Sequence, residues 1–391
     1  MATFQETEQV KATIAPRHLK FELIQICRGI AAIMVVLYHC NNATRDYFKM
    51  LPVKGVFSLG LFGVDFFFVL SGFIITYVHL QDIRKQKNLD VFLKKRFIRI
   101  YPIYWVFAII TFLFLVLYLN GKPDLFDHQL QLNSFGDWMY IIKSFALFPQ
   151  PFISLVDVSW TLTFEVLFYA MFAIAIIAGW KISRLIYFGW IILILLNMSG
   201  IFNTENFYFN FVFNPLILEF LMGCLLAYNF RNEIVKLTLP LFLVLAGLLL
   251  IASLIYLKGF GHQLGREGFG FVVIVSAAFL ALWGSATLDK TNRFKAARLK
   301  PMLVVGDASY SIYLTHTLMI RILYEAGFKA FQSFNIAATT LSVNLLFLLI
   351  ALIAVITGVI FHYVVEKPLL SSLNSRLLGK KGQDSVVLKP A

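Results

Sequence analysis

Apolar residues in this chain are grouped into long stretches that are separated by short polar segments. Many stretches reach about 20 residues, the length that an α-helix needs to cross the hydrocarbon core of a bilayer. We place ten of them at residues 22–40, 56–80, 100–119, 160–178, 184–202, 211–229, 238–257, 268–287, 303–327 and 338–365. The segment 138–148 is too short to cross, and we expect it to be interfacial or re-entrant. The pattern therefore predicts an all-α polytopic integral membrane protein with about ten transmembrane helices.

The composition supports a membrane protein. Hydrophobic residues make up 59% of the 391 residues and charged residues only 14%, and the mean hydropathy is +0.78. A soluble domain has about 25% charged residues. The three cysteines, Cys27, Cys40 and Cys224, show neither paired nor metal-ligand spacing. We therefore expect free thiols and no metal site.

Basic residues are distributed unevenly between the two sets of loops. With a cytoplasmic N-terminus, 24 of the 34 Lys and Arg residues lie in cytoplasmic segments and 8 in outer ones, while Arg28 and Arg321 lie inside apolar stretches. This bias predicts that both termini are cytoplasmic. Anionic inner-leaflet lipid explains the net charge of +13, so we expect membrane lipid and no nucleic acid as a partner. We divide the chain into an N-terminal segment (1–21), a transmembrane domain (22–368) and a cytoplasmic tail (369–391).

Ionisable residues inside lipid-length apolar segments are costly and usually functional. Arg28 and His39 belong to one such segment, and their spacing separates them by about 16 Å along a helix axis. The predicted orientation places Arg28 toward the cytoplasm and His39 in the outer half. Asp65, in "GVDFFFVLSGF", and Glu165, in "SWTLTFEVLFY", are predicted to share that outer half. His39, Asp65 and Glu165 therefore predict an outward-opening cavity suited to acid–base chemistry.

A second group of charges lies at the cytoplasmic end of the third stretch, in "KKRFIRIYPIYW". Arg96 and Arg99 are three residues apart and project from one helix face. Guanidinium pairs suit phosphate because their donors fork onto two oxygens. With Arg28 on the same side, the inner mouth is predicted to bind a phosphorylated molecule.

Structural alternatives exist for each of these residues. The two arginines on the third stretch are also consistent with membrane anchors beside an aromatic belt, and Arg28 with a side chain that extends to the headgroups. Asp65 and Glu165 are consistent with hydrogen bonds between helices. His316 and Glu219 lie within apolar stretches as well, where packing is the simplest role, and Glu366 is expected to be a cap or anchor at the inner end.

The chain resembles the membrane acyltransferase 3 family. The matching segments are "RGIAAIMVVLYH", "GVDFFFVLSGFI", "RFIRIYPIYW", "SWTLTFEVLFY", "EFLMG", "SYSIYLTH" and "VVEKP", in this order between residues 28 and 368. The Arg-to-His spacing and the Trp-Thr-Leu-x-x-Glu segment are the specific features, and the chain is most similar to the exopolysaccharide and O-antigen O-acetyltransferase branch. The resemblance implies transfer of an acyl group, usually acetyl from acetyl-CoA, to a hydroxyl of a cell-surface glycan. In that family, Arg28, His39, Arg96, Arg99 and Glu165 align with residues regarded as functional.

These observations predict a multi-pass O-acyltransferase of the bacterial plasma (inner) membrane. We expect Arg28, Arg96 and Arg99 to bind cytoplasmic acetyl-CoA, whose pantetheine arm would reach His39. His39 would act as general base or as an acylated nucleophile, with Glu165 or Asp65 orienting its ring. The acceptor would be an exported glycan, free or lipid-linked. The alternative is an ion-coupled transporter or flippase of glycan precursors, in which His39, Asp65 and Glu165 form a proton relay.

Overall fold

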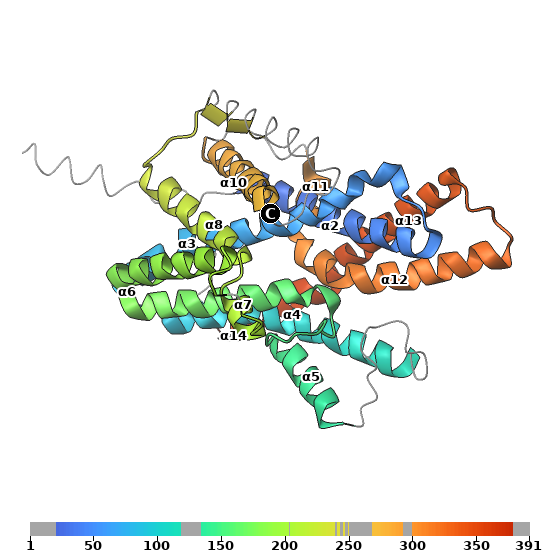
Figure 1. Ribbon diagram of the computed structural model, residues 1–391, viewed down its shortest axis with the longest axis horizontal. Helices are drawn as coiled ribbons and strands as arrows, with labels where there is room; N and C mark the ends of the chain where they lie inside the picture. The colour runs from blue at the N-terminus through green and yellow to red at the C-terminus, as the bar shows by residue number, and fades with distance from the viewer. Residues whose placement is uncertain are drawn as a thin grey trace, which may run out of the picture.

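The computed structural model describes residues 21–118, 134–202, 204–238, 268–291 and 299–377, together with residues 241, 242, 245, 246 and 249 (Figure 1). Every regular element in these ranges is helical, which confirms the all-α prediction there. The α-helices are α2 (Glu22–Phe48), α3 (Phe62–Lys85), α4 (Leu89–Tyr118), α5 (Phe135–Ala146), α6 (Trp160–Met198), α7 (Phe207–Val212), α8 (Leu216–Asn232), α10 (Gly268–Lys290), α11 (Lys300–Asp307), α12 (Ser309–Ser333), α13 (Thr340–Phe361) and α14 (Lys367–Leu377). Two 3-10 helices, η1 (Pro52–Leu61) and η3 (Asp157–Ser159), and a π-helical turn, η5 (His362–Glu366), connect them.

Seven segments in the described part are long and apolar enough to cross a membrane. They are Glu22–Phe48, Val56–Lys85, Leu89–Leu117, Asp157–Met198, Phe207–Asn232, Gly270–Lys290 and Thr340–Leu377. The protein is thus a multi-pass membrane protein. The predicted stretch 303–327 falls on α11 and α12, which are not among the seven, and 238–257 lies largely outside the described residues. The count of ten and the side of each terminus stay predictions.

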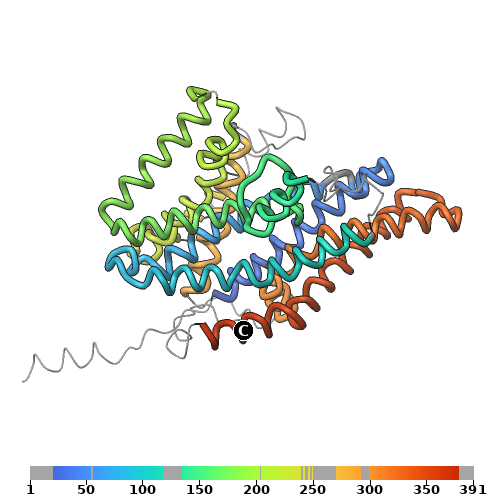
Figure 2. Tube along the Cα trace, turned by 90° about the horizontal axis from the view of Figure 1, so that it is seen from below, coloured from blue at the N-terminus to red at the C-terminus, as the bar shows by residue number. Residues whose placement is uncertain are grey.

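The predicted stretches 160–178 and 184–202 both fall on α6. Gly179 interrupts this helix with φ 77° and ψ 171°, a conformation that glycine adopts because it lacks a Cβ atom. Figure 2 shows the two halves of α6 diverging from this bend. One continuous run of helical residues therefore provides two separately directed segments. The short segment 138–148 falls mostly on α5, which has 12 residues and is not among the seven candidate spans.

The contact between α3 and α8 depends on small residues. A Cβ atom on Gly223 would lie 1.9 Å from Val69 O, and one on Gly72 would lie 1.9 Å from Phe220 O. Helix axes come this close in membranes where glycine replaces a larger side chain. Arg231, near the end of α8, donates to Tyr77 O near the end of α3 at 2.6 Å, so the two helices run parallel.

The start of α2 is held by α10. Asp289 Oδ1 accepts a hydrogen bond from Leu23 N at 2.9 Å, and Oδ2 accepts one from Ile24 N at 3.2 Å. These backbone N–H groups have no partner within their own helix. A carboxylate from a distant helix therefore provides the N-terminal cap of α2, the helix that carries both Arg28 and His39.

Candidate functional site

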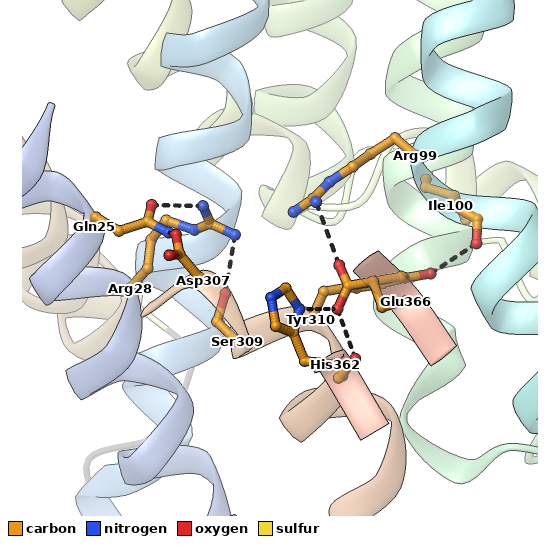
Figure 3. A network of polar contacts seen from close by, with 10 residues as sticks. Gln25, Arg28, Arg99, Ile100, Asp307, Ser309, Tyr310, His362 and Glu366 are labelled. Atoms are coloured by element: carbon orange, nitrogen blue, oxygen red, sulfur yellow. Dashed lines mark hydrogen bonds and ion pairs between the residues drawn. The ribbon is translucent and has the colours of Figure 1, made fainter. Parts of the chain in front are cut away.

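Arg28 and Arg99 come from different helices and point toward the same space (Figure 3). Arg28 donates from Nη1 to Gln25 Oε1 at 2.8 Å and from Nη2 to Ser309 Oγ at 2.9 Å. Gln25 in turn donates to the Asp307 carboxylate. Neutral oxygen atoms accept both of these hydrogen bonds, and the carboxylates of Glu366, Asp307 and Glu165 interact with the guanidinium electrostatically.

Arg99 lies on α4 with its side chain 41% exposed. Its Nη1 is 3.8 Å from Glu366 Oε1, and its guanidinium lies 5.4 Å above the ring of Tyr310. Glu366 is buried in the π-helical turn η5, where its Oε2 accepts from Ser311 Oγ at 2.6 Å and contacts His362 Nδ1 at 2.8 Å. π-helical turns are rare and are frequent at functional sites. Glu366 therefore pairs with Arg99, in addition to the capping or anchoring role expected from its sequence position.

Arg96 lies one turn before Arg99 and is enclosed by aromatic rings. Its guanidinium is 5.7 Å from the ring centroid of Phe92 and 5.6 Å from that of Tyr169. Its Nη2 atom is 3.4 Å from His79 Nε2. We define the arginine cluster as Arg28, Arg96 and Arg99. It combines the three cations that the sequence predicted for the inner mouth.

Glu165 lies with the arginine cluster. Its Oε1 accepts from Ser71 Oγ at 3.1 Å and from the Tyr169 hydroxyl, and it interacts electrostatically with Arg28. We expected Glu165 beside His39 in the outer half. It lies in the second turn of α6, eight residues after Asp157, and at the rise of a helix eight residues span about 12 Å along the axis. That displacement is enough to move its carboxylate from the outer group to the arginine cluster.

His39 lines a cavity of about 290 Å³ between α2, α4, α12 and the segment before α6. We call it the outer cavity, because the predicted orientation of the chain puts His39 in the outer half; its polar lining residues include Asn42, Thr111, Asp157 and Arg321. Asp157 is the carboxylate that interacts electrostatically with His39. Neither Asp65 nor Glu165 belongs to the lining. The acidic partner of His39 in the structure is therefore a residue that the sequence analysis did not select.

His316 is a second histidine beside His39, with ring centroids 5.0 Å apart. It is fully buried, and its Nδ1 is 2.7 Å from Tyr313 O and 3.1 Å from Ile312 O. A carbonyl only accepts, so Nδ1 carries the hydrogen and Nε2 carries a lone pair. Nε2 has no hydrogen-bond partner in the part of the chain that the structure describes. The segment "SYSIYLTH" had drawn attention to this residue, but its proximity to His39 required the fold.

Asp65 occupies a different environment from His39. It is fully buried in the first turn of α3. It lies on α3, which packs closely against α8, and Glu219 on α8 is also fully buried.

Comparisons with known proteins identify several relatives of the chain. A family model described as an acyltransferase domain matches residues 22–364. O-acetyltransferase OatA of Staphylococcus aureus (strain NCTC 8325 / PS 47) is 25% identical over 335 residues, which cover 80% of this chain and 52% of that protein. Peptidoglycan O-acetyltransferase OatA of Listeria monocytogenes is 25% identical over 325 residues, covering 74% of this chain and 47% of that protein.

A shorter relative is covered over most of its length. Exopolysaccharide production protein ExoZ of Rhizobium meliloti is 29% identical over 306 residues, which are 75% of this chain and 84% of that protein. By contrast, the chain spans about half the length of the two OatA proteins. No solved structure matches the chain.

Proposed function

This chain belongs to the acyltransferase family matched over residues 22–364, and from that premise we propose that it is a membrane O-acyltransferase of the bacterial plasma membrane. It transfers an acetyl group from cytoplasmic acetyl-CoA to a hydroxyl of a cell-surface or exported polysaccharide. The names of the relatives, which refer to O-acetylation, peptidoglycan and exopolysaccharide production, support the acetyl group and the glycan.

One observation carries the proposal. The continuous helix α2 connects the arginine cluster to the outer cavity, because Arg28 belongs to the first and His39 lines the second. Their separation along the axis is about 16 Å. A donor with a phosphorylated head and a long pantetheine arm fits two sites arranged in this way. Its phosphates bind the arginines, and its thioester extends to His39.

The chemistry follows from the outer site. A glycan hydroxyl enters the outer cavity, and its oxygen attacks the thioester carbonyl while His39 takes its proton. The carbon–sulfur bond then breaks, and the CoA thiolate takes a proton from the imidazolium. Asp157 stabilises that cation electrostatically. Alternatively, His39 attacks the thioester carbonyl and releases the CoA thiolate; the glycan hydroxyl then takes the acetyl group from His39, and its proton goes to the thiolate. Glu165 balances part of the charge of the arginine cluster before the donor binds.

The experiment uses the full chain in proteoliposomes with acetyl-CoA labelled in the acetyl group and chitopentaose as the glycan probe. We expect label in the oligosaccharide and free thiol in equal amounts. His39→Gln should lower this transfer by about 10²–10⁴-fold, the range for loss of a general base, while acetyl-CoA binding persists. Label retained on the wild-type protein in a single turnover would indicate the acyl-histidine route. Transfer at the wild-type rate by His39→Gln would refute the catalytic role of this residue.

A transporter is the second candidate function, and the buried carboxyl groups of Asp65 and Glu219 favour it. It predicts proton-dependent movement of a lipid-linked glycan without consumption of acetyl-CoA. The same proteoliposomes separate the two functions, because only an acyltransferase releases CoA thiol.

A further inference from the structure

We propose that His79 is a positioning residue that orients Arg96 toward the phosphates of the acyl donor. The inference rests on the proposed function for the identity of the ligand. Asp82 and Asn88 complete the arrangement, and we call these four residues, Asn88, Asp82, His79 and Arg96, the polar chain.

The polar chain is continuous and runs from the exposed Asn88 through the half-buried Asp82 to the buried His79 and the half-buried Arg96. His79, on α3, is 3% exposed. Its Nδ1 is 2.7 Å from Asp82 Oδ2, and its Nε2 is 3.4 Å from Arg96 Nη2. Asn88 Nδ2 donates to the other carboxylate oxygen, Asp82 Oδ1, at 2.7 Å. Each polar group of the His79 side chain therefore has one partner.

Arg96 and Asp82 determine which ring nitrogen of a neutral His79 carries the hydrogen. A guanidinium only donates and a carboxylate only accepts, so the hydrogen of a neutral imidazole must lie on Nδ1. Nε2 then carries the lone pair that accepts from Arg96. In many metalloproteins a carboxylate fixes the orientation of an imidazole in the same way, and the imidazole then binds a metal ion. Here the imidazole orients a cation of the protein itself.

The turn between α3 and α4 brings the members of the polar chain together. Gln86 and Asn88 have φ values of 50° and 62°, a left-handed conformation that asparagine tolerates better than most residues. This tight reversal sets the start of α4 against the end of α3. The Phe92 ring then packs edge-to-face on His79, with centroids 5.1 Å apart, and its face lies 5.7 Å from the Arg96 guanidinium.

Arg96 keeps donors for a ligand in this arrangement. His79 takes Nη2, and the rings of Phe92 and Tyr169 cover the guanidinium faces. Arg96 Nε is buried and donates to no acceptor in the described part of the chain. A buried N–H group without an acceptor is destabilising. A phosphate oxygen of acetyl-CoA would accept a hydrogen bond from Arg96 Nε. His79 thus restricts Arg96 to one orientation in which Nε and the remaining N–H groups face the anion.

The test measures acetyl-CoA binding to the full chain in lipid nanodiscs. His79→Leu should weaken binding about 10-fold, the lower end of the range for residues that orient a ligand-binding group. His79→Gln should restore most of the affinity, because its amide can accept from Arg96 and donate to Asp82. In an Arg96→Ala background, His79→Leu should have no further effect, since coupled residues are not additive.

Asp82→Asn provides a variant at a less buried position, with a side chain 17% exposed. An amide cannot accept from both His79 and Asn88 on separate oxygens, so we expect binding weaker than in the wild type. The matched control is Asp90→Asn, at the start of α4. It removes an exposed carboxylate that lies 3.8 Å from Lys94 Nζ. This control should bind acetyl-CoA normally.

Three results would overturn the inference. One is that His79→Leu and Asp82→Asn both fold and bind acetyl-CoA with wild-type affinity. Another is that His79→Leu lowers this affinity by the same factor in the wild-type and in the Arg96→Ala background. If wild-type protein shows no binding of acetyl-CoA at all, the donor assigned under the proposed function is wrong, and the role of His79 is refuted with it.

Discussion

The two charged sites differ in the residues that balance them. His39 interacts with Asp157 at the outer cavity, whereas Glu165 hydrogen-bonds to Ser71 and Tyr169 beside the arginine cluster. A carboxylate next to an imidazole stabilises its cation, and one next to arginines moderates their repulsion. The two carboxylates therefore belong to different steps of the proposed reaction.

Replacing Asp157 by Asn should slow acetyl transfer without weakening acetyl-CoA binding. The amide removes the charge that stabilises the His39 imidazolium, and an electrostatic loss of about 1.4 kcal/mol corresponds to a tenfold lower rate. Initial rates in proteoliposomes and binding in nanodiscs measure the two quantities separately. Glu165→Gln is the comparison variant and should change donor binding. A loss of donor affinity in Asp157→Asn with an unchanged rate would contradict the assignment.

At the scale of the elements, the closest packing is between α3 and α8, on which Ser71, His79 and Glu219 depend for their positions. The glycines at this contact leave no room for a side chain, because the added carbon would overlap with backbone oxygen. Packing, more than hydrophobicity, holds helices together in lipid. Loss of this contact therefore affects the arginine cluster, where Ser71 donates to Glu165 and His79 contacts Arg96.

Gly223→Ala should therefore lower the stability of the folded protein by about 1–3 kcal/mol, the usual effect of overpacking. Thermal unfolding of the detergent-solubilised protein measures this change. Gly189→Ala on α6 is the control, since an added Cβ there has nothing within 4 Å. Its unfolding temperature should equal or slightly exceed that of the wild type, because alanine favours a helix. Equal unfolding temperatures for the two variants would show that α3 and α8 can separate without a penalty.

At the scale of the whole molecule, the proposed reaction requires the arginine cluster to face the cytoplasm, where acetyl-CoA is made. The excess of Lys and Arg in the predicted inner loops supports this orientation. Reporter fusions should place 81–99, 288–302 and the C-terminal tail in the cytoplasm, and 121–158 on the outer side. If the 81–99 segment is labelled from outside intact cells, the orientation is the opposite of the predicted one, and acetyl-CoA cannot bind the arginine cluster from the cytoplasm.

The sequence alone determined the class of the protein and selected the three arginines of the arginine cluster. Apolar length and charge bias are sums over many residues, so they predict membrane helices without knowledge of contacts. Arg96 and Arg99 share a face because one helical turn separates them, and Arg28 and His39 are spaced by their own helix. These relations are local, and the structure retains them as helices α4 and α2.

Only the tertiary structure decided which residues from different helices meet. Hydropathy tolerates a shift of one or two turns along a helix, and a shift of that size exchanged Glu165 for Asp157 as the carboxylate near His39. The pairing of His39 with His316 and of His79 with Arg96 depends on the close packing of separate helices and on a left-handed turn. Such contacts arise from shape and hydrogen bonding between segments that are distant in the chain, and the periodicity of a single segment contains no information about its neighbours.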